Sequence, residues 1–154
     1  MSETLYKFLD EDGKPAHGGT GQWQQPKGKR PGKWMPAIKP ILCEQGYHLC
    51  REQDLLSWCA PELWEAEAKG KRVEADDKIC VAQARLIRRV EAWNQRNVRL
   101  FAADCAEHVL HIFENQHPDD QRPRLAILAA RDFATGKIDK EAAREAWAAA
   151  REAG

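Results

Sequence analysis

The stretch that most constrains this fold covers residues 97–138, which contain two strongly marked helical segments. The residues that end or begin a helix here are Pro118, Asp119, Asp120, Pro123 and Gly136. Proline cannot continue a helix interior but is tolerated in a first turn, while aspartate caps an N-terminus and glycine favours a C-terminal end. The stretch therefore predicts a helix over about 97–115, a sharp turn, a second helix and a stop, which is a scaffold rather than a reaction.

Apolar residues recur in the first of these helices at spacings of three and four. They are Leu100, Phe101, Cys105, Val109, Leu110, Ile112 and Phe113, and we expect this stripe to face a core. Asp104 and Glu107 stand four residues before His108 and His111. Such pairs suit surface ion pairing or a metal, but the order E-H-x-x-H is weaker evidence than H-E-x-x-H, and no metal site is predicted.

Two more helices are expected in this half of the chain. Residues 77–93 carry Ile79, Leu86, Val90 and Trp93 at helical spacing, behind the capping residues Asp76 and Asp77. Residues 139–153 are rich in alanine, which favours a helix, and Trp147 is their only large anchor. This last helix packs on the pair before it or mediates self-association, which leaves a homodimer open.

The first half of the chain has the features of strands. Residues 4–9 are rich in aromatic and β-compatible types, and residues 62–68 alternate with period two. Strands followed by helices give the α+β class. We therefore predict a small antiparallel β-rich unit at 1–75, followed at 76–154 by a bundle of about four helices.

A long segment at 14–40 is dense in glycine and proline and contains no acidic residue. Its candidate binding residues are Trp23, Lys27, Lys29, Arg30, Lys33 and Trp34. Lysine and arginine neutralise phosphates and indole rings stack on bases, so the segment suits a nucleic-acid or protein partner. The alternative is a surface loop whose tryptophans fold back onto the core.

Histidine and cysteine cluster between the strands, at Cys43, His48, Cys50 and Cys59. Their spacing matches none of the usual zinc pairs, and no cofactor is expected. His48 with Glu65 or Glu67 makes a less favoured alternative, a small enzyme in which a strand-borne carboxylate acts as base. No nucleophile or oxyanion donor accompanies them, so the sequence leans away from an enzyme.

Composition excludes some classes of protein. The 24 basic residues balance 24 acidic ones, whereas a protein that coats nucleic acid is usually strongly basic. No apolar run is long enough to span a membrane, and the start has no basic region followed by an apolar one. We therefore expect a cytoplasmic protein, in which the five cysteines stay reduced.

One motif in the helical half carries a family resemblance. Its residues are Ala103 to Glu107, Pro118 to Asp120, Arg122 to Arg124, Ala126, Ile127, Ala130, Arg131 and Gly136. In these residues the chain resembles the helical immunity proteins of bacterial polymorphic toxin systems. That resemblance implies a helical array that works by binding another protein.

The first half also carries a resemblance, in three short pieces. They are Gly46 to His48, Trp64 to Glu67, and Lys78 to Cys80, and they are similar to domains of unknown function in phage and bacterial hypothetical proteins. The similarity implies a bacterial or phage source and assigns no catalytic residue. Together the two resemblances favour a non-enzymatic binding protein of a conflict system, whose partner is a toxin or a host or phage defence component. Nucleic-acid binding through the basic segment is the alternative.

Overall fold

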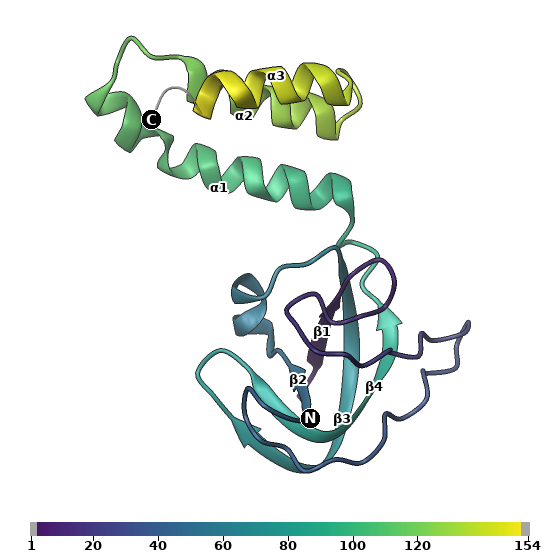
Figure 1. Ribbon diagram of the computed structural model, residues 1–154. Helices are drawn as coiled ribbons and strands as arrows, with labels where there is room; N and C mark the ends of the chain where they lie inside the picture. The colour runs from purple at the N-terminus through teal and green to yellow at the C-terminus, as the bar shows by residue number, and fades with distance from the viewer. Residues whose placement is uncertain (1–2, 152–154) are drawn as a thin grey trace. The chain divides into compact units, whose positions relative to one another are not determined.

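The computed structural model describes residues 3–151 and divides the chain into two compact units, with the boundary between Trp93 and Asn94. The first unit is built on one antiparallel sheet in the order β1-β3-β4-β2 (Figure 1). Its strands are β1 (Leu5–Leu9), β2 (Tyr47–Leu49), β3 (Glu62–Glu74) and β4 (Ile79–Arg89). The strands predicted at 4–9 and 62–68 are confirmed, and the second continues further than expected.

The sheet curls so that its two outer strands meet. Tyr6 of β1 and Cys50, which directly follows β2, exchange two backbone hydrogen bonds of 2.8 Å. Leu9, Leu49, Ile79 and Leu86 fill the interior of the curl and are almost completely buried. A short 3₁₀ helix, Glu52–Ser57, follows the closure.

The helix predicted over 77–93 is wrong, because residues 79–89 form β4. This strand pairs with β3 from Trp64 opposite Arg89 to Glu74 opposite Ile79. Apolar residues at helical spacing also fit a strand that is buried on both faces near one end, as Ile79, Cys80 and Val81 are. The predicted unit boundary at 75/76 therefore falls between two paired strands. The two compact units of the structure instead meet between Trp93 and Asn94.

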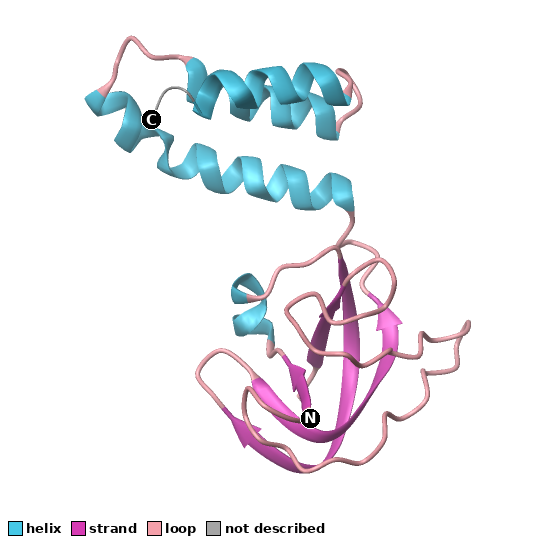
Figure 2. Ribbon diagram, in the orientation of Figure 1, coloured by secondary structure: helices cyan, strands magenta, loops and turns pink. Residues whose placement is uncertain are grey.

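The glycine- and proline-rich segment is ordered along the edge of β4. The backbone N–H groups of Gly32, Met35 and Ile38 donate to the carbonyls of Leu86, Ala84 and Ala82, at 2.8, 2.8 and 3.0 Å. Figure 2 draws this segment as a loop that runs beside the strands. It covers an edge that would otherwise expose unpaired backbone groups.

The second unit consists of α1 (Gln95–Gln116), α2 (Arg122–Ala134) and α3 (Lys140–Arg151). Strands followed by helices confirm the α+β class. Residues predicted to end and begin helices do so: Gly136 has φ 75°, and the Asp139 carboxylate accepts a hydrogen bond from the N–H of Ala142 at 2.9 Å. No helix within residues 3–151 is both long and apolar enough to cross a membrane.

The helices pack in sequence, with α2 against both α1 and α3. A small core of Ala103, Leu110 and Ile127 holds α1 to α2. Ion pairs frame this contact: Arg131 reaches Asp104 at 2.7 Å and Glu107 at 2.6 Å. The acidic residues flagged in the sequence as ion-pair or metal groups are therefore partners of an arginine on the next helix.

Candidate binding surfaces

Four basic residues of the 14–40 segment lie on or just after a tight turn. Lys27 and Arg30 exchange two backbone hydrogen bonds, at 3.0 and 3.1 Å, and Gly28 between them has φ 58°. Lys27, Lys29, Arg30 and Lys33 are all exposed. Within the described part of the chain none of the four takes part in a salt bridge, so their charges are available to a partner.

Trp23 does not share this surface. Its side chain is only 3% exposed and belongs to the main core of the sheet. The ring lies edge-on to Tyr47, with centroids 5.6 Å apart. In this conformation Trp23 cannot stack on a base, and its role is to anchor the segment to the sheet.

Trp34 is half-buried, and its ring is covered by two cations from the sheet. The ammonium of Lys69 lies 4.2 Å and the guanidinium of Arg85 4.6 Å from its centroid. These contacts hold the segment against β3 and β4. Of the six predicted binding residues, the four basic ones form an open surface and the two tryptophans contact the chain itself.

The strand-borne glutamates are partners of arginines on the neighbouring strand. Glu67 pairs with Arg85 at 2.6 Å, and Glu65 with Arg88 at 2.5 Å. His48 instead lies opposite Cys80, five positions along β4 from Arg85. The structure therefore does not bring His48 together with Glu67.

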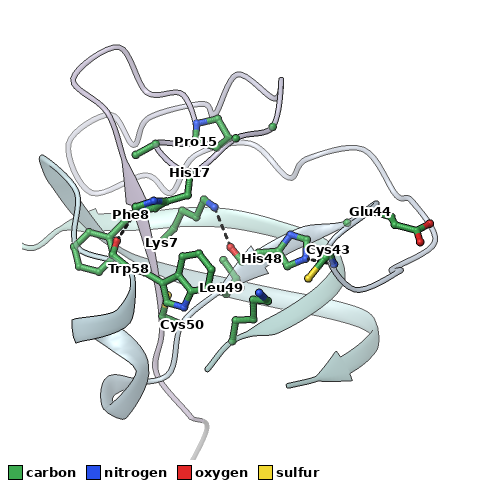
Figure 3. Close-up of a pocket in the computed structure, with 15 residues that line it drawn as sticks. Lys7, Phe8, Pro15, His17, Cys43, Glu44, His48, Leu49, Cys50 and Trp58 are labelled. Carbon is green, nitrogen blue, oxygen red and sulfur yellow. Dashed lines mark hydrogen bonds between the residues drawn. The ribbon is translucent and has the colours of Figure 1, made fainter. Parts of the chain in front are cut away.

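His48 lines a different cavity, shown in Figure 3. Its Nε2 accepts a hydrogen bond from the backbone N–H of Cys43 at 3.1 Å. Burial, followed by the charges of Lys7 and Lys78, lowers the pKa of His48. Burial also raises the pKa of the Cys50 thiol to about 11, so this thiol stays protonated at neutral pH. A protonated thiol is a poor nucleophile and a poor metal ligand.

The outer face of α1 is a second open surface. Phe101, Cys105, Val109 and Ile112 are all exposed, Val109 by 52% and Ile112 by 55%. Their spacing places them on one side of the helix, opposite the side where Ala103 and Leu110 meet α2. The apolar stripe predicted to be buried is thus largely turned away from the helices it was expected to contact. We call Phe101, Cys105, Val109 and Ile112 the α1 stripe.

Comparison with known proteins finds a similarity to one family in this helical part. Residues 88–154 match a family model described as "Imm-5 like putative immunity protein". The match covers less than half of the chain and includes all three helices. It supports the resemblance carried by the motif at 103–136. No curated protein and no solved structure matches the chain.

Proposed function

We propose that this protein is an immunity-type binding protein that acts by contact with a second protein, most simply a toxin. The observation that carries the proposal is the exposed α1 stripe, which lies inside the segment matching the immunity family. The finer assignment to a bacterial or phage conflict system follows from that similarity. Contact alone, without chemistry on the partner, is sufficient for such a role.

The composition of the α1 stripe supports a protein partner. From Phe101 to Ile112 this side of the helix carries no lysine, arginine, aspartate or glutamate, and its only other polar group is His108. Interface centres are depleted of charge and enriched in aromatic and aliphatic side chains. The segment spans about 16 Å along the helix, enough to form the centre of an interface of ordinary size.

The test is co-expression with candidate toxins encoded beside this gene. Protection of growth and a stable complex in size-exclusion chromatography with light scattering are the expected results. The double variant Val109→Glu, Ile112→Glu is expected to lose both, because two charges would be buried without partners. A variant neutralised at Lys27, Lys29, Arg30 and Lys33 is the matched control, since those residues lie in the other unit.

Two outcomes contradict the proposal. One is a double variant that is folded by circular dichroism and still binds and protects as the wild type does. The other is a wild-type chain that covers its own stripe by forming a homodimer, with no toxin bound at any concentration. Light scattering of the chain alone, with and without the double substitution, distinguishes self-association from toxin binding.

A second candidate function, nucleic-acid binding, is favoured by the basic turn alone. Lys27, Lys29, Arg30 and Lys33 have no ion-pair partner among residues 3–151, whereas Arg85 and Arg88 on β4 are neutralised by glutamates. Fluorescence anisotropy with DNA and RNA over a salt series tests it. Four phosphate contacts to duplex DNA give a log–log slope of about −3.6. No binding at low salt, or equal binding by the neutralised variant, removes this candidate.

A further inference from the structure

The cavity beside His48 has the size and the walls of a small-molecule site. Its volume is about 390 Å³, within the range of ordinary ligand pockets. Its apolar walls include Phe8, Leu49 and Trp58, and the 15–19 segment lines it as well. All of these residues belong to the first unit, outside the region that matches the immunity family.

Trp58 is a fixed, flat wall of this cavity. Its indole N–H donates to the carbonyl of Asp77 at 2.7 Å. His17 lies edge-on to the ring, with centroids 5.4 Å apart, and its Nε2 is 3.0 Å from the Trp58 carbonyl. The ring is therefore oriented before any ligand arrives, which lowers the entropy lost on binding.

Two ammonium groups line the cavity, one from β1 and one from the residue that precedes β4. Lys7 of β1 donates to the carbonyl of His48 at 3.0 Å, and Figure 3 shows its side chain directed toward that carbonyl between His17 and His48. An ammonium has three donors, and no other hydrogen bond from Lys7 is present among the described residues. Lys78 lies with its ammonium 4.6 Å from the centre of the Trp58 ring.

Negative charge balances these cations only in part, because Lys78 has an ion-pair partner and Lys7 has none among the described residues. Among residues 3–151, Glu44 is the only carboxylate that lines the cavity, and in Figure 3 it points away from the other labelled side chains. Asp77 approaches the ammonium of Lys78 only to 3.8 Å. Burial is the main cause of the lowered pKa of His48, and the charges of Lys7 and Lys78 lower it further.

We propose that this cavity binds a small anion attached to a flat apolar body, such as an aromatic carboxylate or phosphate ester. Lys7 and Lys78 hold the anionic group, and the flat body packs against Trp58. An anion restores the charge balance that the protein leaves open, and the enclosed walls strengthen that attraction relative to water. This site is independent of the protein-binding role proposed above.

The protonation of Lys7 gives the site a pH dependence. Burial lowers the pKa of Lys7 from 10.5 to about 8, against a small opposing influence of Cys50. Most of the ammonium is therefore charged at neutral pH and loses its proton as the pH rises through about 8. An anion that needs this charge binds more weakly above that pH.

Calorimetric titration of the full chain tests the site with phenyl phosphate, benzoate, inorganic phosphate and phenol. We expect saturable binding of phenyl phosphate or benzoate with a dissociation constant below about 1 mM, and affinity that falls above pH 8. Inorganic phosphate and phenol, which lack the apolar body or the charge, bind more weakly. The phosphate and carboxylate arms identify which anion the two lysines prefer.

Variants connect the binding to the two lysines. Lys7→Met and Lys78→Gln are each expected to weaken the aromatic anion by about tenfold or more, because each removes a charge-assisted hydrogen bond. Lys78→Gln stays informative if Lys7→Met fails to fold, since the Lys78 ammonium contacts the Trp58 ring and Asp77 and is not the group that holds the His48 carbonyl. The control, Lys27→Gln, removes the same single charge outside the cavity and should leave affinity unchanged.

Three results would overturn the proposal. The first is no saturation by either aromatic anion at about 1 mM. The second is an equal loss of affinity in the control, which would assign binding to overall charge. The third is equal affinity for phenol and phenyl phosphate, which would assign binding to the apolar walls without the lysines.

Discussion

Leu110 and Ile112 stand two positions apart on α1 and face opposite ways: Leu110 is 7% exposed and Ile112 is 55% exposed. Leu110 packs with Ala103 and Ile127 in the core between α1 and α2. Ile112 belongs to the α1 stripe. A similar aliphatic side chain therefore stabilises the helical unit at one position and is free to contact a partner at the other.

Alanine substitution is expected to separate these roles. Leu110→Ala should lower the free energy of unfolding of the helical unit by about 2.5 kcal/mol, because it leaves a cavity between the helices. Ile112→Ala should change it by no more than about 0.5 kcal/mol. Urea unfolding followed by helical circular dichroism measures both. Equal losses would place Ile112 in a core and remove the basis for a docking face.

In the helical unit, the sequence predicts where helices begin and end, but not which face of α1 is buried. Asp120, Pro123 and Gly136 act at helix ends through local backbone geometry, which a short window of sequence contains. Which face of α1 meets α2 depends on long-range contacts. Alanines and arginine–carboxylate pairs make that contact, so the most apolar stripe is not the most buried one.

The same distinction explains the first unit. Residues 79–89 fit a helical period locally, but pairing with β3 and with the 32–38 segment makes them a strand. Lys7, Trp58 and Lys78 line the cavity from three separate parts of the sequence, so no local sequence motif predicts it. The sequence shows the charged cluster at 27–33 directly, whereas the burial of Trp23 depends on the sheet it packs on.

Gly46 is expected to tolerate no side chain. Its φ is 123°, and a Cβ there would overlap Sγ of the buried Cys80. Gly46→Ala should therefore destabilise the β unit by about 3 kcal/mol, through backbone strain and overpacking together. Thermal unfolding measured by tryptophan fluorescence reports the change.

Gly28 provides the comparison, because its φ is 58° but nothing lies within 4 Å of an added Cβ. Gly28→Ala should cost only the conformational part, about 1 kcal/mol. If the two variants unfold at the same temperature, the close packing of Gly46 on Cys80 is not important for stability.

Asp120 is expected to titrate at unusually low pH. Its carboxylate accepts hydrogen bonds from the guanidinium of Arg122, at 2.7 and 2.9 Å, and from the Arg122 backbone N–H, at 3.0 Å. These bonds lower the pKa of Asp120 from 3.8 to about 2. Because the folded pKa is depressed, the stabilisation is present above pH 3.8 and is lost as the pH falls through about 2.

Carboxyl chemical shifts over an acid titration measure this pKa directly. In Arg122→Gln the Asp120 midpoint should move upward, toward the ordinary value, since the side-chain hydrogen bonds are the largest cause of the shift. The backbone bond remains in that variant, so part of the depression should persist. An unchanged midpoint would show that Arg122 does not hold the carboxylate in solution.

Closure of the curled sheet depends on the backbone of Tyr6. Its N–H donates to Cys50 and its carbonyl accepts from Cys50, both at 2.8 Å. Tyr6→Pro removes the donor and leaves the Cys50 carbonyl unpaired, so it should lower the free energy of unfolding by about 2 kcal/mol or more. Tyr6→Phe keeps both backbone bonds and should cost far less. Amide hydrogen exchange at Cys50 locates the effect: it should accelerate in Tyr6→Pro and stay protected in Tyr6→Phe. Equal exchange in the two variants would mean that this bridge does not close the sheet.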